Sequence, residues 1–236
     1  MNTQILKGIL CAAIAALLPA AALAQANVTW QAPVTITGAS DVLTAGSLLG
    51  TWAPFAGDAI PGLVVNGVTF KAFADLPNAA TSLDNGTGSG SFRSPGFSDA
   101  NYNDLMTAGA FGNNNTSYTI SWNGMTAGDT YAVQLWVNDG RNSTVNQRTE
   151  TVTGGANTSA SLAYGSGSSG PGQYIIGTFI ADASGAETLT LNPGSAFPSP
   201  QFNLIQVRDI TPVPEPSAVA MSLIGFGVLV SVLRRK

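Results

Sequence analysis

Many short runs of β-forming residues, separated by turn-forming pairs, constrain the fold of this chain more than any other feature. Thr, Val, Tyr and Ile dominate these runs, and Asn66-Gly67, Asn123-Gly124 and Asp139-Gly140 favour turns between them. We therefore predict an all-β domain over residues 25–211, an antiparallel two-sheet β-sandwich (jelly roll). The predicted strands are Val28–Trp30, Val34–Thr37, Leu63–Phe73, Ser117–Trp122, Thr130–Val137, Gln147–Thr153, Tyr174–Ala181, Glu187–Leu191 and Phe202–Ile210.

Thr130–Val137 is the clearest of these strands. Its alternation places Tyr131, Val133, Leu135 and Val137 on one face, which we expect in the core, and leaves Trp136 on the other face as an outward candidate. Tyr174–Ile180 is apolar on both faces, which is typical of a central strand, and Gly177 within it indicates a bulge or close packing. Two segments rich in Gly, Ser and Asn, Asp84–Gly96 and Gly165–Gly172, are expected to be surface loops.

The amino terminus has the pattern of a cleaved secretory signal over residues 1–24. Lys7 supplies a positive charge, Ile9–Leu18 is apolar, and the small residues Ala22 and Ala24 precede the expected cut by signal peptidase. The apolar run is too short for a membrane anchor, which needs about 20 residues. Cys11, the one cysteine, lies inside this segment, so the mature domain contains no disulfide.

The carboxyl terminus, residues 212–236, combines a proline-rich stretch, an apolar run and a cationic end. Ser217–Leu233 has no charge over 17 residues, and Arg234, Arg235 and Lys236 follow it. As a helix this run is roughly 25 Å long, close to the minimum for spanning a bilayer. The positive-inside rule then places the three cations in the cytoplasm and the domain outside.

Pro214, Glu215 and Pro216, followed by this helix and the basic end, resemble the PEP-CTERM sorting signal of Gram-negative bacteria. The resemblance implies recognition of these three residues by an exosortase-type transpeptidase, removal of the helix and delivery to the cell surface or extracellular matrix. A GPI signal also has a removable apolar tail, but such tails usually end without a cationic cluster.

Composition narrows the chemistry. The chain contains no histidine, which excludes every mechanism or metal site that depends on one. Residues 25–211 keep five of the nine basic and twelve of the thirteen acidic residues, a formal charge of −7 that argues against nucleic-acid binding. Carboxylate chemistry and hard-metal binding remain possible.

A second resemblance covers roughly residues 28–210. The segments Gly128–Trp136, Asn138–Arg141, Tyr174–Phe179 and Asn203–Arg208 are similar to the jelly-roll sandwiches of galactose-binding and malectin-like modules. The resemblance implies a scaffold that binds sugars in other proteins.

The candidate ligand-binding residues are Trp136, Asn138, Asp139 and Arg141. Aromatic faces stack on sugar rings, although core packing is the commoner role of Trp30, Trp52, Trp122 and Trp136. The polar residues after Val137 suit hydroxyl recognition or Ca²⁺, although Asp139-Gly140 also suits a plain turn. Ser98–Asp104 alternates oxygen-bearing residues but lacks the Gly and Glu of a calcium loop, so we expect a solvated loop there.

These features predict an exported, non-catalytic surface or matrix protein associated with extracellular polysaccharide. Two alternatives stay open. One is a carboxylate-dependent enzyme that modifies polysaccharide, which would need two close acidic side chains in a cleft. The other is a purely structural surface protein without a discrete ligand.

Overall fold

The computed structural model describes residues 25–54, 62–71, 83–84, 86–92, 96–141, 148–165, 170–194 and 199–212. The predicted signal peptide and the predicted helix at 217–233 both lie outside these residues. No helix within the described ranges is long and apolar enough to cross a membrane.

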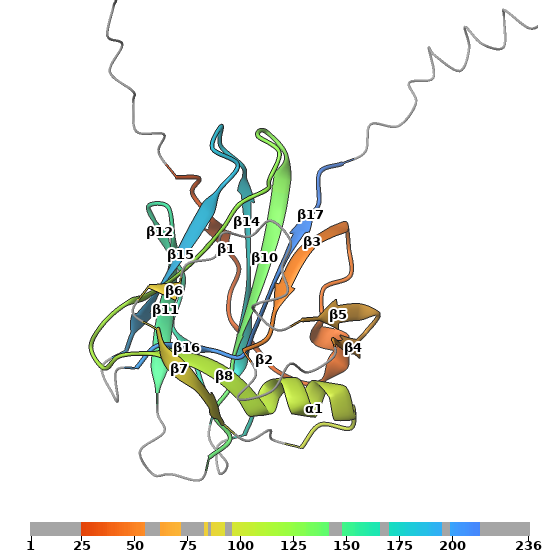
Figure 1. Cartoon of the computed structure of the whole chain (residues 1–236), viewed down its shortest axis with the longest axis vertical. Helices are drawn as coiled ribbons and strands as arrows, with labels where there is room; N and C mark the ends of the chain where they lie inside the picture. Colours follow the sequence, from red (N-terminus) through yellow and green to blue (C-terminus); the bar gives the residue numbers. More distant parts are fainter. Residues whose placement is uncertain are drawn as a thin grey trace, which may run out of the picture.

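Two antiparallel sheets pack face to face, which confirms the predicted β-sandwich (Figure 1). We name them after their central strands, the β10 sheet and the β15 sheet. The β10 sheet contains, in spatial order, β1 (Thr29–Trp30), β14 (Gln173–Ile180), β10 (Thr130–Val137), β17 (Leu204–Asp209) and β3 (Ser47–Trp52), with β2 (Val34–Thr35) also paired to β14. The β15 sheet contains β12 (Asn157–Thr158), β11 (Thr149–Gly154), β15 (Glu187–Pro193), β9 (Tyr118–Trp122) and β6 (Leu83–Asp84), with β13 (Leu162–Ala163) also paired to β11.

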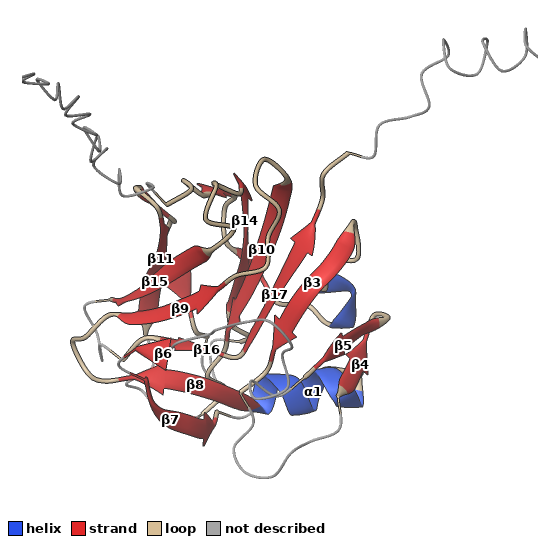
Figure 2. Cartoon of the chain, turned by 45° about the horizontal axis from the view of Figure 1, so that its top comes forward, coloured by secondary structure: helices blue, strands red, loops and turns tan. Residues whose placement is uncertain are grey.

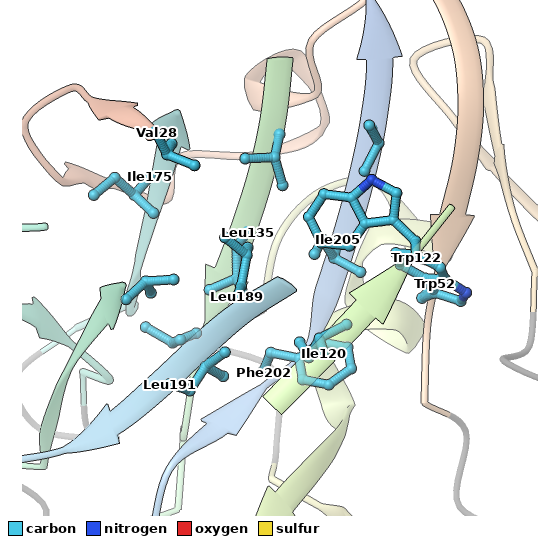
Figure 3. Packing of buried hydrophobic residues seen from close by; sticks show 14 of the residues in the cluster. Val28, Trp52, Ile120, Trp122, Leu135, Ile175, Leu189, Leu191, Phe202 and Ile205 are labelled. Atoms are coloured by element: carbon cyan, nitrogen blue, oxygen red, sulfur yellow. The ribbon is translucent and has the colours of Figure 1, made fainter. Parts of the chain in front are cut away.

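The main core fills the space between the two sheets (Figure 3). Every second side chain of β10 points into this core. These residues are Tyr131, Val133, Leu135 and Val137, as predicted from the sequence. Trp52 and Trp122 meet there from opposite sheets, with ring centroids 5.9 Å apart. The described residues of both core clusters lie between positions 26 and 207, and we therefore expect residues 25–212 to fold on their own.

A notch formed by two glycines receives Val28 at one edge of the sandwich. A Cβ on Gly177 would lie 2.4 Å from Val28 Cγ1, and a Cβ on Gly154 would lie 2.3 Å from Val28 Cγ2. Real Cβ contacts are never this short, so both positions require glycine. The close packing predicted at Gly177 is therefore confirmed, and the amino-terminal strand closes an edge that belongs to both sheets.

The outer face of the β10 sheet is covered by three small elements (Figure 1). They are η1 (Ala39–Asp41), a hairpin of β4 (Leu63–Val65) and β5 (Val68–Phe70), and α1 (Ala100–Thr107). Leu63–Phe73, predicted as one strand, thus contains a hairpin whose turn, Asn66-Gly67, has positive φ at both residues. The solvated loop expected at Ser98–Asp104 is instead largely helix, because Asp99 caps α1 by accepting a hydrogen bond from Tyr102 N at 2.8 Å.

A third, smaller sheet lies beside α1 and contains β16 (Gln201–Phe202), β8 (Ala108–Gly112) and β7 (Gly86–Ser91). Part of Asp84–Gly96, expected to be a surface loop, therefore forms strand β7, with its backbone paired to β8. The segment has no apolar alternation that could have predicted this pairing.

The two ends of β10 define two ends of the domain (Figure 2). At the tail end, Thr130 O accepts a hydrogen bond from Ile210 N at 2.8 Å, and Thr130 N donates to Thr211 Oγ1 at 2.8 Å. Gln25 also lies at this end, against the first residues of β15. At the far end, Asn138 follows Val137. The eight-residue strand separates the two ends by roughly 23 Å.

Candidate functional site

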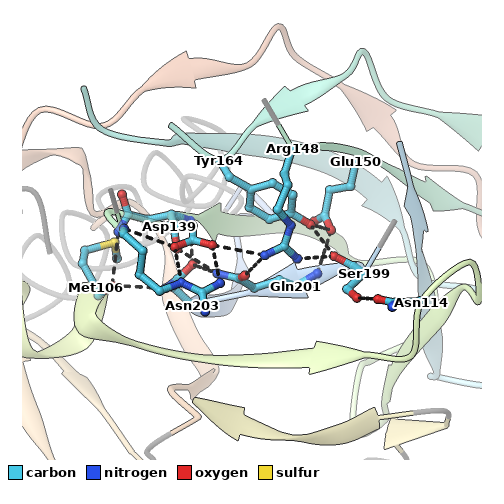
Figure 4. Close-up of polar contacts among 11 residues, drawn as sticks. Met106, Asn114, Asp139, Arg148, Glu150, Tyr164, Ser199, Gln201 and Asn203 are labelled. Atoms are coloured by element: carbon cyan, nitrogen blue, oxygen red, sulfur yellow. Dashed lines mark hydrogen bonds and ion pairs between the residues drawn. The ribbon is translucent and has the colours of Figure 1, made fainter. Parts of the chain in front are cut away.

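A buried polar network occupies the far end, where the chain leaves β10 (Figure 4). We call it the far-end network and define it by the residues Asn138, Asp139, Arg141, Arg148, Glu150, Tyr164, Gln201 and Asn203. Three segments supply these side chains: the residues that follow β10, the residues that flank and form β11 and β13, and the residues around β16.

The two asparagines of the network tie the far end together. Asn203 Nδ2 donates to Met106 O at 3.2 Å and to Ala108 O at 2.8 Å, while its Oδ1 accepts from Asn138 N at 2.6 Å. Asn138 Nδ2 donates to Met106 O at 3.3 Å, and its Oδ1 accepts from Gly172 N at 3.2 Å. The sequence-predicted Asn138 is thus fully buried and holds α1, β10 and β14 in place.

Asp139 is fully buried and receives two guanidinium groups. Arg141 donates from Nε to Oδ1 at 2.8 Å and from Nη2 to Oδ2 at 2.7 Å, the bidentate geometry that fixes an arginine most firmly. Arg148 donates from Nη1 to Oδ2 at 3.1 Å. This carboxylate raises the pKa of Arg141. Two cations around one carboxylate also make Asp139 a poor Ca²⁺ ligand.

Arg148 links Asp139 to a second carboxyl group. Its Nη1 also donates to Gln201 Oε1 at 3.4 Å, its Nη2 donates to Ser199 O, and its guanidinium lies 4.7 Å from the centre of the Tyr164 ring. Glu150 Oε2 accepts from the Tyr164 hydroxyl and from Gln201 N. Burial raises the pKa of Glu150 to about 8, so this carboxyl group is largely protonated at neutral pH.

Arg141 is the member of the network that reaches the surface. Its side chain is half exposed, whereas Arg148 and Asp139 are buried. The guanidinium lies 4.8 Å from the centre of the Phe92 ring, in addition to its two bonds to Asp139. The sequence-predicted pair Asp139 and Arg141 is therefore brought together, with the arginine facing solvent.

Trp136 requires a correction. The expected outward-facing ring is fully buried and cannot act as a stacking platform in this structure. It packs in the second core cluster, with ring centroids 6.1 Å from Phe70 and 6.0 Å from Tyr174. The physical reason is the cover supplied by α1 and the β4–β5 hairpin, neither of which we identified from the sequence.

The other candidates also turn out to be structural. Trp52 and Trp122 are core residues, and Trp30 is partly buried against the core, with its Nε1 donating to Asn157 O at 3.3 Å. Within the described ranges, no group of three acidic side chains gathers to hold a metal ion. Asp99, which lies in the segment of alternating oxygen-bearing residues, caps α1.

Sequence reasoning missed Arg148, Glu150, Tyr164, Gln201 and Asn203. A signal for two of them was present: in the predicted strand Gln147–Thr153, Arg148 and Glu150 alternate with the same parity as the core residue Val152. A charged residue on the apolar face of a strand predicts a buried partner of opposite charge or a shifted pKa.

The carboxyl-terminal residues match the protein-family model of the PEP-CTERM protein-sorting motif, over residues 212–236. The chain carries a PEP-CTERM sorting motif at its carboxyl terminus. This motif indicates an exported protein that an exosortase-type system sorts to the cell surface. The PEP-CTERM resemblance drawn from Pro214, Glu215 and Pro216 is therefore confirmed, while the predicted cleavage positions stay predictions.

Solved structures with a similar fold are malectin-like ectodomains of plant receptors. The ANX2 ectodomain from Arabidopsis thaliana gives a TM-score of 0.52 at 14% identity, over 73% of this chain and 56% of that one. The ANX1 ectodomain from the same plant gives 0.50 at 19% identity, over 72% of this chain and 52% of that one. This chain thus spans just over half the length of those structures. The likeness confirms the malectin-like resemblance at the level of the fold, and no curated protein matches the chain.

Proposed function

We propose that the protein is exported by a Gram-negative bacterium through two successive cuts. Signal peptidase cleaves after Ala24, and the helix at 217–233 then holds the domain on the outer side of the inner membrane. Arg234, Arg235 and Lys236 stop the chain in the cytoplasm. An exosortase-type transpeptidase cuts at Pro214-Glu215-Pro216 and delivers the domain to the surface or the extracellular matrix. The sorting motif at 212–236 supports this route.

At its destination, the domain binds extracellular polysaccharide through its far end, without catalysis. The observation that carries this proposal is the placement of two features on β10: the sorting tail leaves beside Thr130, whereas Arg141 lies beyond Val137. A domain attached through its tail therefore presents Arg141 away from the point of attachment. Exposed loops at the end of a rigid sandwich are common binding surfaces.

The chemistry of Arg141 suits recognition of sugar hydroxyl and carboxylate groups. Its planar guanidinium is held by two bonds to the buried Asp139 and by the Phe92 ring, so little side-chain freedom remains to be lost on binding. Arg148 supplies a second positive charge next to Asp139, and protonated Glu150 does not cancel it. The far end therefore carries a positive charge within an acidic domain.

Burial of both carboxyl groups favours binding over catalysis. A polysaccharide-modifying enzyme needs two acidic side chains that reach the substrate. Asp139 and Glu150 are each fully buried, and both oxygens of Asp139 accept hydrogen bonds from arginine. A substrate at the surface does not contact either group in this structure.

The binding proposal is tested with the 25–212 domain and exopolysaccharide from the producing bacterium, with and without Ca²⁺. We expect retention that weakens about tenfold in Arg141→Ala, the loss typical of one charge-assisted hydrogen bond. Lys71→Ala is the matched control, because it removes an exposed cation from a residue outside the far-end network. Absence of retention under every condition contradicts the proposal and favours a purely structural surface protein.

The sorting proposal has a separate test in the producing cells. Replacing Pro214, Glu215 and Pro216 by alanine is expected to leave a larger, membrane-bound protein, as seen by fractionation and immunoblotting. Unchanged size and location would contradict transpeptidase recognition at this motif.

A further inference from the structure

A second buried carboxyl group, Glu187, lies at the tail end, against the first described residue of the domain. Glu187 begins β15 and is 1% exposed. Gln25 Nε2 donates to Glu187 Oε1 and to Thr188 O. Gln25 is also the residue that becomes the amino terminus if signal peptidase cuts after Ala24.

The Glu187 carboxyl group is incompletely satisfied. Its Oε2 is buried and has no hydrogen-bond partner. Among the described residues, the charged group that acts on it is Asp182, which has the same sign and does not neutralise it. Burial, together with Asp182, raises the pKa of Glu187 to about 7. A buried carboxylate without a cation is costly, which calls for a partner.

Signal cleavage creates a cation at this place. Hydrolysis of the Ala24–Gln25 bond turns the peptide nitrogen of Gln25 into an α-ammonium group and leaves a carboxylate on Ala24. An α-ammonium group has an ordinary pKa of about 7.7–8.0, so it is largely charged at neutral pH. It belongs to the same residue whose side-chain amide already contacts Glu187.

We propose that Glu187 is the binding site for the processed amino terminus, with its buried carboxylate pairing with the α-ammonium group of Gln25. This inference rests on the proposed cleavage after Ala24. The precursor lacks the cation, so the pair forms only in the processed protein.

The pair would fix the amino-terminal segment, residues 25–31, which contacts both sheets. Asn27 Oδ1 accepts from Ala156 N at 2.7 Å, Val28 N donates to Gly154 O at 3.2 Å, and Gln31 N donates to Ile176 O at 2.9 Å. Val28 itself fills the notch at Gly154 and Gly177. Anchoring Gln25 therefore holds closed the edge of the main core, and processing increases the stability of the exported form over that of the precursor.

The test compares three forms of the 25–212 domain: one beginning with the free amine of Gln25, one with that amine acetylated, and one with Ala24 in front. We expect the free-amine form to melt about 2–4 °C above the acetylated form at neutral pH. The Ala24 form should melt near the acetylated one, because its ammonium group lies one residue, about 3.8 Å, farther along the chain. Intact mass confirms that Gln25 has not lost ammonia by cyclising.

Two variants decide which carboxyl group is responsible. Glu187→Gln should abolish the difference between free and acetylated forms, whereas Glu150→Gln, which changes the buried acid at the far end, should preserve it. Equal melting temperatures in the unsubstituted domain, or a difference that survives Glu187→Gln, would overturn the inference.

A direct titration covers the case in which Glu187→Gln does not fold. NMR of a domain labelled at Gln25 gives the pKa of its α-ammonium group, which pairing should raise above the ordinary range. An unshifted value would overturn the inference. The mass of the amino-terminal peptide from exported protein tests the cleavage itself: a start elsewhere overturns both proposals, whereas a start at Gln25 without the stability difference overturns the pairing alone.

Discussion

Glu150 and Glu187 lie in the same sheet, and both face the core, but their hydrogen-bond partners and neighbouring charges differ. Glu150, at the far end, has Tyr164, Gln201 N and the nearby Arg148 as partners. Glu187, at the tail end, has the Gln25 side-chain amide and the Thr188 backbone as hydrogen-bond partners, with Asp182 opposing its charge. Each carboxyl group keeps one buried oxygen, Glu150 Oε1 or Glu187 Oε2, without a hydrogen-bond partner among the described residues. The difference lies in the nearby charge, which is an arginine at the far end and an aspartate at the tail end. The comparison sets a network formed within the fold against a site that we propose is completed by processing.

Removing the charge that organises the far end should have the largest effect. Asp139→Asn leaves the buried Arg148 beside a neutral group, and we expect the free energy of unfolding to fall by about 3–5 kcal/mol, measured by urea denaturation. Asp182→Asn is the matched change at the tail end and should alter stability little, because Asp182 is only half-buried and asparagine keeps an oxygen that can accept from Ser184. Similar losses in the two variants would contradict the contrast between the ends.

The pH dependence of stability should reveal Glu150. Its pKa is about 8 in the folded protein against 4.5 ordinarily, so the folded state keeps a proton that the unfolded state releases. The contribution is complete below pH 4.5 and is lost as pH rises towards 8, at up to about 1.4 kcal/mol per pH unit. Glu150→Gln should flatten the decline in unfolding free energy between pH 5 and 8. An unchanged slope would show that Glu150 does not titrate in this range.

Glu187 should produce a smaller effect over a narrower window. Its pKa of about 7 gives the same sign, with stability lost between pH 4.5 and 7. Glu187→Gln in the acetylated domain should therefore reduce the slope less than Glu150→Gln does. If the free amine pairs with Glu187, this window shrinks further in the free-amine form, because a cation lowers the pKa of the carboxyl group. Identical pH profiles of unfolding free energy for the free-amine and acetylated forms would contradict pairing between Glu187 and the amino terminus.

The alternation of apolar and polar residues predicts the fold correctly where one face of a strand is buried. The alternation of Thr130–Val137 predicted its core face residue by residue, and Gly177 predicted a close approach that Val28 makes. In the β15 sheet, strands β9, β11 and β15 alternate buried and half-buried residues, so the outer face is more exposed than the core face. Polar residues on such a face are expected from the sequence.

The alternation of apolar and polar residues does not predict burial where an irregular segment covers the outer face of a sheet. Gln134 and Gln206 are buried on the outer face of the β10 sheet because they bind backbone groups of Asp41 and Leu43. A glutamine in a strand does not by itself predict burial, so the sequence does not reveal the segments that cover this face. For that reason the sequence predicts an outward-facing Trp136. The far-end network could not be predicted for the same reason. Asn203 and Gln201 donate to backbone carbonyl groups, and no sequence motif encodes such bonds.

The sorting tail continues from β17, which is hydrogen-bonded on both sides, to β10 and to β3. The far end is reached through β10, which runs antiparallel to β17. A load applied between a polysaccharide at Arg141 and an anchor beyond Thr211 would pull these neighbouring strands past one another along their length. All the hydrogen bonds between them would then bear force together, rather than opening one after another. In the proposed arrangement, the pairing of β10 with β17 would therefore resist a shearing load between ligand and anchor.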